Sequence, residues 1–156
     1  MNTSQPRTAY LSYNVLSSRE NIITGLILLA GFVLRLRQYL IGRSLWLDEA
    51  MLALNIVDRG FGDLFKPLDY DQGAPIGFML IEKTFSLILG RNEFSLRLFP
   101  FLVGLISLWL FYLLLKHFTH GTGLWVGLAL FAFNPRLIYY SSEVKQYIVD
   151  VTITIL

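Results

Sequence analysis

Apolar residues follow one another in long runs along this chain, and most charged residues lie between the runs. Three runs approach the length of about 20 residues that a helix needs to cross the hydrocarbon layer of a membrane. They cover residues 21–40, 95–115 and 122–140. Asn134 and Pro135 interrupt the third run near its end, and a fourth opens at Tyr147. The pattern predicts an all-α, multispanning membrane protein with about four transmembrane helices.

The fourth run, residues 147–156, stops short of a full crossing. A spanning helix has to satisfy its backbone hydrogen bonds through the whole hydrocarbon layer, so a half-length helix does not cross. We therefore expect the sequence to be the N-terminal piece of a longer protein, with residues 1–20 as a cytoplasmic tail. Arg35 and Arg37 follow the uncharged core of the first run, residues 22–34, and no small-residue cleavage site comes after it. These features favour an uncleaved helix over a signal peptide.

Residues 41–94, between the first two long runs, predict an outer loop with two short interfacial helices. Asp48 suits the N-cap of a helix over residues 49–59, and Pro75 suits the first position of a helix over residues 75–90. The glycines, prolines and acids between these helices predict irregular backbone.

Glu82 and Lys83 lie at the centre of the second of these helices. Each charge would cost about 2.5–3.5 kcal/mol at the middle of a bilayer. We therefore expect this helix to lie in the headgroup layer with both side chains toward water. The tail and the turn at residues 116–123 carry more basic than acidic residues, whereas the long loop is acidic on balance. The positive-inside rule then places the loop on the periplasmic or exterior face of the inner, plasma membrane.

Composition supports the membrane class and removes several others. Apolar residues make up 54% of the 156 residues and charged residues 15%, against roughly 25% in an average soluble domain. The absence of cysteine excludes a disulfide scaffold, a thiolate zinc site and a cysteine nucleophile. The net charge of +2 is too small and dispersed to indicate nucleic-acid binding.

Two adjacent acids, Asp48 and Glu49, are the first candidates for chemistry. They have a structural interpretation, in which they cap a helix and balance the partial charge of its first turn. They also have a functional one, in which a carboxylate at the membrane surface acts as a general base while its neighbour orients it or binds a metal. The residues alone leave both open.

Cations near the outer ends of the first two long helices have two interpretations as well. Arg97, Arg35 and Arg37 could reach toward water from a buried stem, or bind phosphate with the planar guanidinium.

A further polar group follows the third run. In a continuous helix, Glu143, Tyr147 and Asp150 would share one face, which would indicate a cavity. The alternative is an interfacial tyrosine belt in which Glu143 and Lys145 form an ion pair in water.

Five segments taken in order resemble the N-terminal part of the GT-C glycosyltransferases, closest to the branch that contains the protein O-mannosyltransferases, the aminoarabinose transferases and the Rgt-type enzymes. The segments are Arg35-Leu-Arg37, Leu-Trp-Leu-Asp48-Glu49-Ala, Gly73-Ala-Pro-Ile, Asn92-Glu-Phe-Ser-Leu-Arg97-Leu-Phe-Pro and Ala132-Phe-Asn-Pro-Arg-Leu-Ile-Tyr-Tyr-Ser-Ser-Glu143-Val-Lys-Gln-Tyr147. Each is degenerate alone, and their order and spacing are fairly specific. The resemblance covers residues 22–156.

The resemblance implies an inverting transferase that moves a sugar from a polyprenyl-phosphate carrier at the outer membrane face. It places the catalytic acids on Asp48 and Glu49, with Asp48 as base, and a phosphate-binding arginine on Arg97. The second acidic site falls on Glu143 or Asp150. Some relatives use a divalent metal, and four carboxylates could serve as ligands here. These are Glu49, Asp69, Asp71 and Glu143.

The chemistry of such a reaction agrees with the residue types. A leaving phosphate needs cationic stabilisation, which Arg97 could supply together with Arg35, Arg37 or Lys145. Lys145 is a point charge at a position where relatives often carry arginine, which weakens a bidentate role. The donor would be a polyprenyl-phosphate sugar in the lipid, and the acceptor could be a lipid, a glycan or a protein. The alternatives are a non-enzymatic membrane protein, such as part of a transporter or a scaffold, and an inactive truncated remnant. We expect the isolated 156 residues to be inactive.

Overall fold

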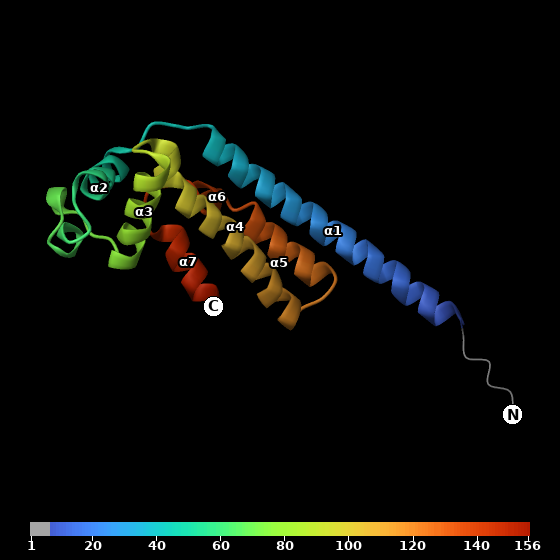
Figure 1. Ribbon diagram of the computed structural model, residues 1–156. Coiled ribbons are helices and arrows are strands. Elements are labelled where there is room, and N and C mark those ends of the chain that lie inside the picture. Colours follow the sequence, from blue (N-terminus) through green and yellow to red (C-terminus); the bar gives the residue numbers. More distant parts are fainter. Residues whose placement is uncertain (1–6) are drawn as a thin grey trace, which may run out of the picture.

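The computed structural model describes residues 7–156, with side chains from Arg19 onward, and this part contains helices and no strand, which confirms the all-α class. Three helices form a bundle: α1 (Arg7–Leu40), α4 (Glu93–Phe118) and α5 (Thr122–Ala132) (Figure 1). Of the predicted tail, residues 1–6 lie outside the described residues. The rest of the tail belongs to α1, which begins well before the predicted start at residue 21.

Two helical stretches are long and apolar enough to cross a membrane, namely Arg19–Leu40 of α1 and the whole of α4. The other two predicted spans are shorter. The run at 122–140 is divided into α5 and α6 (Pro135–Tyr140), and α7 (Tyr147–Ile155) has nine residues. The division arises because the Asn134 side chain accepts the first backbone N–H groups of α6, and Pro135 opens that helix.

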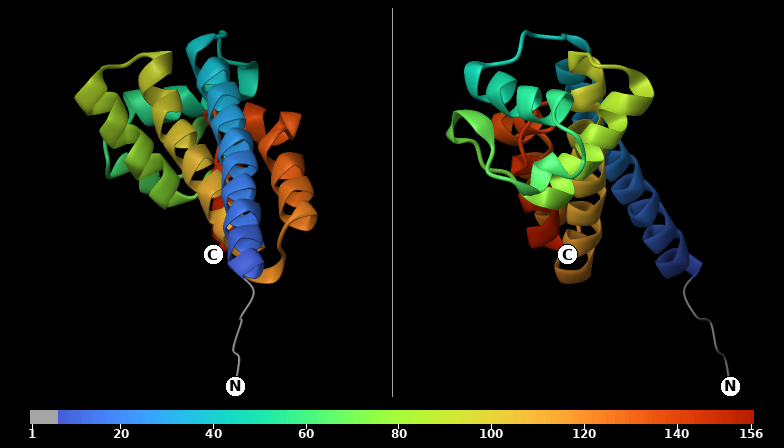
Figure 2. Two further views of the ribbon diagram at one scale, coloured as in Figure 1. Left: turned by 90° about the vertical axis from the view of Figure 1, so that its right-hand side faces the viewer. Right: turned by 60° about the vertical axis from the view of Figure 1, so that its left-hand side comes forward.

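Helix α4 lies at the centre of the fold and contacts α1, α3, α5 and α7. Its start is well defined, because the Asn92 side chain accepts the backbone N–H of Ser95 at 2.9 Å. An N-cap of this kind satisfies a helix-end donor that has no partner within the helix. Arg97 is therefore held in the first turns of α4, at the end of the bundle where α1 finishes (Figure 2).

The predicted outer loop contains two helices, as expected. They are α2 (Leu47–Asp58) and α3 (Ile76–Leu89), joined by two 3-10 turns at Asp63–Phe65 and Asp69–Asp71. Together with the start of α4 they enclose one apolar core. It consists of Leu52, Ala53, Ile56, Leu64, Phe78, Met79, Leu96 and Val144. A second core lies between α1, α4 and α5 and contains Leu108, Leu128 and Ala132.

The orientation of α3 differs from the prediction that its charges point to water. The Glu82 side chain is fully buried and Lys83 is 5% exposed, whereas Ile88 on the same helix is 74% exposed. Lys83 donates to the carbonyl of Val57 in α2 at 2.8 Å. The face of α3 that packs against α2 and α4 thus carries Glu82 and Lys83 together with the apolar Phe78 and Met79, whereas Ile88 lies on the outer face.

Gly104 allows α4 and the turn before α7 to approach each other closely. A Cβ atom built on Gly104 of α4 would lie 2.4 Å from the Cβ of Ser141, in the turn that leads into α7. Helix α7 can therefore lie along α4 because residue 104 has no side chain.

Burial of Glu82 should make stability depend on pH. Burial raises the pKa of this carboxyl well above its usual value, so the folded chain retains a proton that the unfolded chain loses. The stabilising effect of that proton is complete below the unfolded pKa and is lost as pH rises toward the folded one. We expect the unfolding free energy of wild type minus that of Glu82→Gln to decrease as the pH rises from 4.5 to 7. Denaturant unfolding in detergent measures both values. A difference that stays constant across this range would contradict the buried position of Glu82.

The Gly104 contact gives a second prediction. Gly104→Ala should lower the free energy of unfolding by about 1–3 kcal/mol, because the added methyl group overpacks the contact with Ser141. Gly25→Ala in α1 is the matched control, since a Cβ at Gly25 has open space around it. This control should be neutral or stabilising by up to about 1 kcal/mol. Equal effects of the two substitutions would count against the close contact.

Candidate functional site

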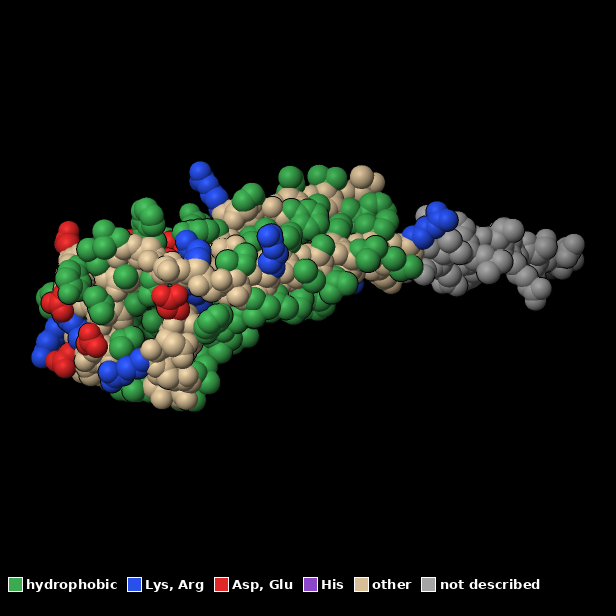
Figure 3. All heavy atoms as spheres, turned by 90° about the horizontal axis from the view of Figure 1, so that it is seen from above, with side chains coloured by type: hydrophobic (Ala, Val, Ile, Leu, Met, Phe, Trp, Pro, Cys, Tyr) green, Lys and Arg blue, Asp and Glu red, His purple; other side chains and the backbone are tan. Residues whose placement is uncertain are grey.

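Several of the predicted acids and cations meet at one end of the bundle. They come from the link between α1 and α2 with the first turn of α2, from the start of α4, and from the turn at residues 141–146, and Gln72 joins them from the segment after the 3-10 turn at Asp69–Asp71. On the face seen in Figure 3, the acidic side chains gather toward the left-hand end of the molecule, and the rest of this face carries mainly apolar and uncharged groups.

Glu49 is the buried centre of this cluster, with no exposed surface. Its carboxylate accepts the backbone N–H of Trp46 at 2.9 Å and that of Val144 at 3.0 Å. Trp46 is the N-cap of α2, so the cap interaction comes from Glu49 and not, as predicted, from Asp48. The bond to Val144 fixes the start of α2 against the turn before α7.

Arg43, which the sequence pattern does not single out, also binds Glu49. Its Nη2 lies 3.3 Å from the Glu49 carboxylate, and its Nη1 donates to the hydroxyl of Tyr139 at 2.6 Å. The guanidinium carbon lies 4.0 Å from the centre of the Tyr139 ring, which adds a cation–π contact. Arg43 therefore joins α6 to the start of α2.

Arg97 lies in the same cluster, as expected. It is 1% exposed, and its Nη1 donates to the carbonyl of Arg43 at 2.5 Å. Its Nε and Nη2 have no hydrogen-bond partner among the described residues. Glu49 and Arg43 are the charged groups that act on it most strongly. A buried guanidinium with donors to spare is a fixed positive charge in a site of low dielectric constant.

Asp48 has a different environment from Glu49. Its side chain is 51% exposed, and it forms an ion pair with Lys145, whose Nζ lies 2.9 Å from Oδ2. The Gln72 amide donates to Oδ1 at 3.0 Å. The hydrogen bond from Lys145 is the main cause that lowers the pKa of Asp48, so its carboxylate is ionised at neutral pH. The structure thus pairs an exposed acid with a nearly buried lysine.

The polar residues that follow α6 do not share a helix face. Glu143 lies in the turn before α7, which begins only at Tyr147, so the predicted shared face is wrong. Glu143 is buried, whereas Tyr147 and Asp150 are exposed. Burial, followed by the charge of Glu49, raises the pKa of Glu143 to about 7. Of the two candidates for the second acidic site, Glu143 lies beside the other acids.

The two arginines of α1 have separate positions. Arg35 is fully buried, and its Nη1 donates to the carbonyls of Gly31 and Ala132 at 3.1 and 3.0 Å. It therefore binds the last turn of α5, which the break at Pro135 leaves without backbone donors. Arg37 is exposed and lines a shallow apolar groove with Leu40.

The carboxylates considered as metal ligands do not gather. Within residues 19–156, no group of three or more His, Cys, Asp or Glu side chains is placed to hold a metal ion. Asp69 instead pairs with Arg59 at 2.8 Å, and Asp71 lies exposed at the same turn. A buried asparagine that the sequence pattern did not single out, Asn55, binds the backbone N–H and carbonyl of Asp69 at 2.8 and 3.2 Å.

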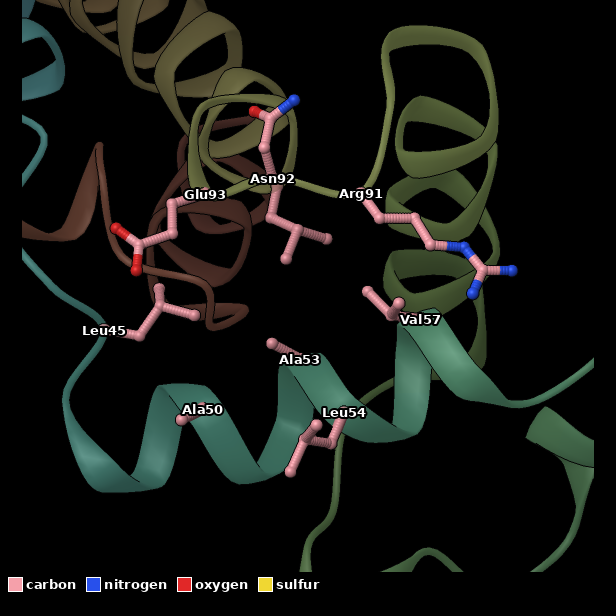
Figure 4. Close-up of a pocket in the computed structure, with 9 residues that line it drawn as sticks. Leu45, Ala50, Ala53, Leu54, Val57, Arg91, Asn92 and Glu93 are labelled. Carbon is pink, nitrogen blue, oxygen red and sulfur yellow. The ribbon is translucent and has the colours of Figure 1, made fainter.

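An apolar pocket of about 270 Å³ lies beside the cluster, between α2 and the link from α3 to α4. Ala50, Ala53 and Val57 of α2 form one wall, and Arg91 and Glu93 at its rim extend in opposite directions (Figure 4). Neither Asp48 nor Lys145 lines this pocket, so it is separate from the charged cluster.

Comparison of the chain with family models, with curated proteins and with solved structures finds no match in any of the three. The description of the fold and of the charged cluster therefore uses only the residues and contacts of this chain.

The burial of Glu49 gives a prediction with a matched control beside it. Glu49→Ala should lower the free energy of unfolding by about 2–4 kcal/mol, because it leaves the backbone N–H groups of Trp46 and Val144 without an acceptor and removes the partner of the partly exposed Arg43. Asp48→Asn should cost less than about 1 kcal/mol, because its ion pair is half exposed. Denaturant unfolding followed by circular dichroism in detergent measures both. A larger loss for Asp48→Asn than for Glu49→Ala would contradict the assigned roles.

Proposed function

We propose that this chain forms the N-terminal part of a membrane-embedded, inverting glycosyltransferase, which moves a sugar from a polyprenyl-phosphate donor to an acceptor at the outer membrane face. The single observation that carries the proposal is the ion pair of the exposed Asp48 carboxylate with Lys145, in the same cluster as the partly exposed Arg43 and the buried Arg97. A base that can reach solvent beside fixed positive charge is the set of groups that this transfer needs.

The membrane setting has its own support. Two helical stretches have the length and hydropathy of a span, and α3 turns apolar residues outward. The charged cluster lies where α1 ends and α4 begins, and thus at one end of both stretches. We propose that α2 and α3 lie in the outer headgroup layer, that α5 with α6 and α7 belong to further crossings, and that the cluster faces the periplasm or exterior.

Each residue of the cluster has a role in the proposed reaction. Asp48 takes the proton from the acceptor hydroxyl or amine as the new bond to the sugar C1 forms. The bond between C1 and the phosphate oxygen breaks, and polyprenyl phosphate leaves with the electron pair. Arg97 and Lys145 stabilise the charge on that phosphate, and an in-line displacement of this kind inverts the configuration at C1.

Glu49 and Glu143 would support this chemistry rather than perform it. Glu49 is fully engaged with Trp46, Val144 and Arg43, so we assign it the positioning of Asp48. Glu143, with a pKa near 7 and an unpartnered Oε2 among the described residues, is the acidic group best placed to approach the acceptor or a divalent metal. A non-enzymatic scaffold would need the same stabilising contacts but not the exposed carboxylate of Asp48.

The test is sugar transfer by the intact protein in vesicles. Asp48→Asn should reduce transfer by at least about 100-fold, since a general base contributes about 10²–10⁴-fold to a rate. Insertion and folding should be unchanged, as checked by protease protection and circular dichroism. The control is Asp58→Asn at the end of α2, which should leave transfer unchanged. Full turnover by Asp48→Asn would remove Asp48 from the mechanism, and no turnover by wild type with any polyprenyl-phosphate sugar would favour a non-enzymatic role.

A further inference from the structure

Gln72 forms a hydrogen bond with each of the two charged groups of the ion pair at the proposed site. Its side-chain carbonyl accepts a hydrogen bond from the Lys145 ammonium at 2.7 Å, and its amide nitrogen donates to the Asp48 carboxylate at 3.0 Å. Lys145 in turn lies 2.9 Å from the other carboxylate oxygen of Asp48. The three side chains therefore close a ring in which every contact joins a donor to an acceptor.

A side-chain amide suits both contacts of this ring. Glutamine has one acceptor and one donor group at its end, so it can bind an ammonium and a carboxylate together. A carboxylate at residue 72 would repel Asp48, and a cation there would repel Lys145. The ring also fixes the plane of the Asp48 carboxylate, because each of its two oxygens has its own partner.

The backbone that carries Gln72 is held to α2 at several points. Asn55 of α2 bonds both backbone groups of Asp69. Arg59, just after α2, pairs with the Asp69 carboxylate and also donates to the carbonyl of Pro67 at 2.8 Å. The turn that ends at Gln72 is therefore attached to the same helix that carries Asp48.

The conformation of this turn is one that side chains rarely adopt. Tyr70 and Asp71 have φ values of 62° and 55°, in the left-handed region that favours glycine. Two consecutive residues remain there only when their surroundings impose it. Here the residue before the strained pair, Asp69, is bonded to Asn55, and the residue after it, Gln72, is bonded to Asp48 and Lys145. Contacts on both sides therefore keep Tyr70 and Asp71 in this conformation.

We propose that Gln72 is a positioning residue for the proposed reaction, which holds the Asp48 carboxylate and the Lys145 ammonium in one fixed arrangement, with Asn55 as its anchor. This inference rests on the proposed function for its catalytic consequence. The ring itself is independent of any activity, so two experiments separate the two claims.

The first experiment observes the ring directly. The chain is labelled with ¹⁵N-glutamine in detergent, and the side-chain amide signal of Gln72 is identified by its loss in Gln72→Leu. Asp48→Ala and Lys145→Met should each move that signal, because each removes one partner of the amide. The Gln38 signal from α1 should stay in place as the internal control. An unmoved Gln72 signal in both variants would overturn the ring, whatever the protein does.

The second experiment measures the consequence in the intact protein. Gln72→Glu keeps the size of the side chain, removes its donor and places a second carboxylate against Asp48, so kcat should fall at least about 10- to 100-fold, the value of a hydrogen bond to a charged group. KM for the polyprenyl-phosphate sugar should change less than threefold. Gln38→Leu should leave both constants unchanged.

The outcomes of the two experiments distinguish the claims. Loss of kcat in Gln72→Glu, with an intact fold by circular dichroism, supports the positioning role. Unchanged kcat in Gln72→Glu overturns it even if the ring is present. A ring without any sugar transfer by wild type would refute the proposed function and, with it, a positioning role in that reaction.

Discussion

The buried carboxylate of Glu49 is the interaction on which the charged end of the molecule depends. It bonds the backbone of Trp46 at the start of α2 and the backbone of Val144 before α7, which lies 95 residues after Glu49 in the chain. Because Asp48 precedes Glu49 and Lys145 follows Val144, this one bond places the exposed acid beside its lysine. A buried charge with a full set of partners stabilises its arrangement strongly, because removing any partner leaves the charge unsatisfied.

Much of the fold followed from the pattern of apolar residues, and the reasons for the exceptions are physical. The run at 95–115 became α4, and its cap by Asn92 is a short-range signal. The sequence shows the interruption at Asn134 and Pro135, but the length of the apolar run predicts one span over residues 122–140 where the structure has two helices. The inward turn of Glu82 was not predictable, because helical periodicity identifies the two faces of a helix but not which one meets the neighbouring helices.

The site divides in the same way. The charged cluster contains five of the predicted site residues, namely Asp48, Glu49, Arg97, Glu143 and Lys145. Arg37 and Asp150 lie outside it. Arg43 and Gln72 had no local signal, because their partners are 96 residues away in Tyr139 and 73 residues away in Lys145. Adjacent acids could not be assigned from sequence, since either can cap a helix. The structure separates them by burial, which makes Glu49 an anchor and leaves Asp48 open to solvent.

The contact between Arg35 and the end of α5 has a consequence for the direction of the chain. The peptide dipoles of a helix sum to a partial negative charge at its C-terminal end. A guanidinium at the Ala132 carbonyl neutralises that charge inside an apolar bundle. The Ala132 carbonyl therefore has a donor where α5 ends, and α6, which begins at Pro135, brings the Tyr139 ring to Arg43. An arginine in the first long helix thus supports the break from which the chain continues to the charged end.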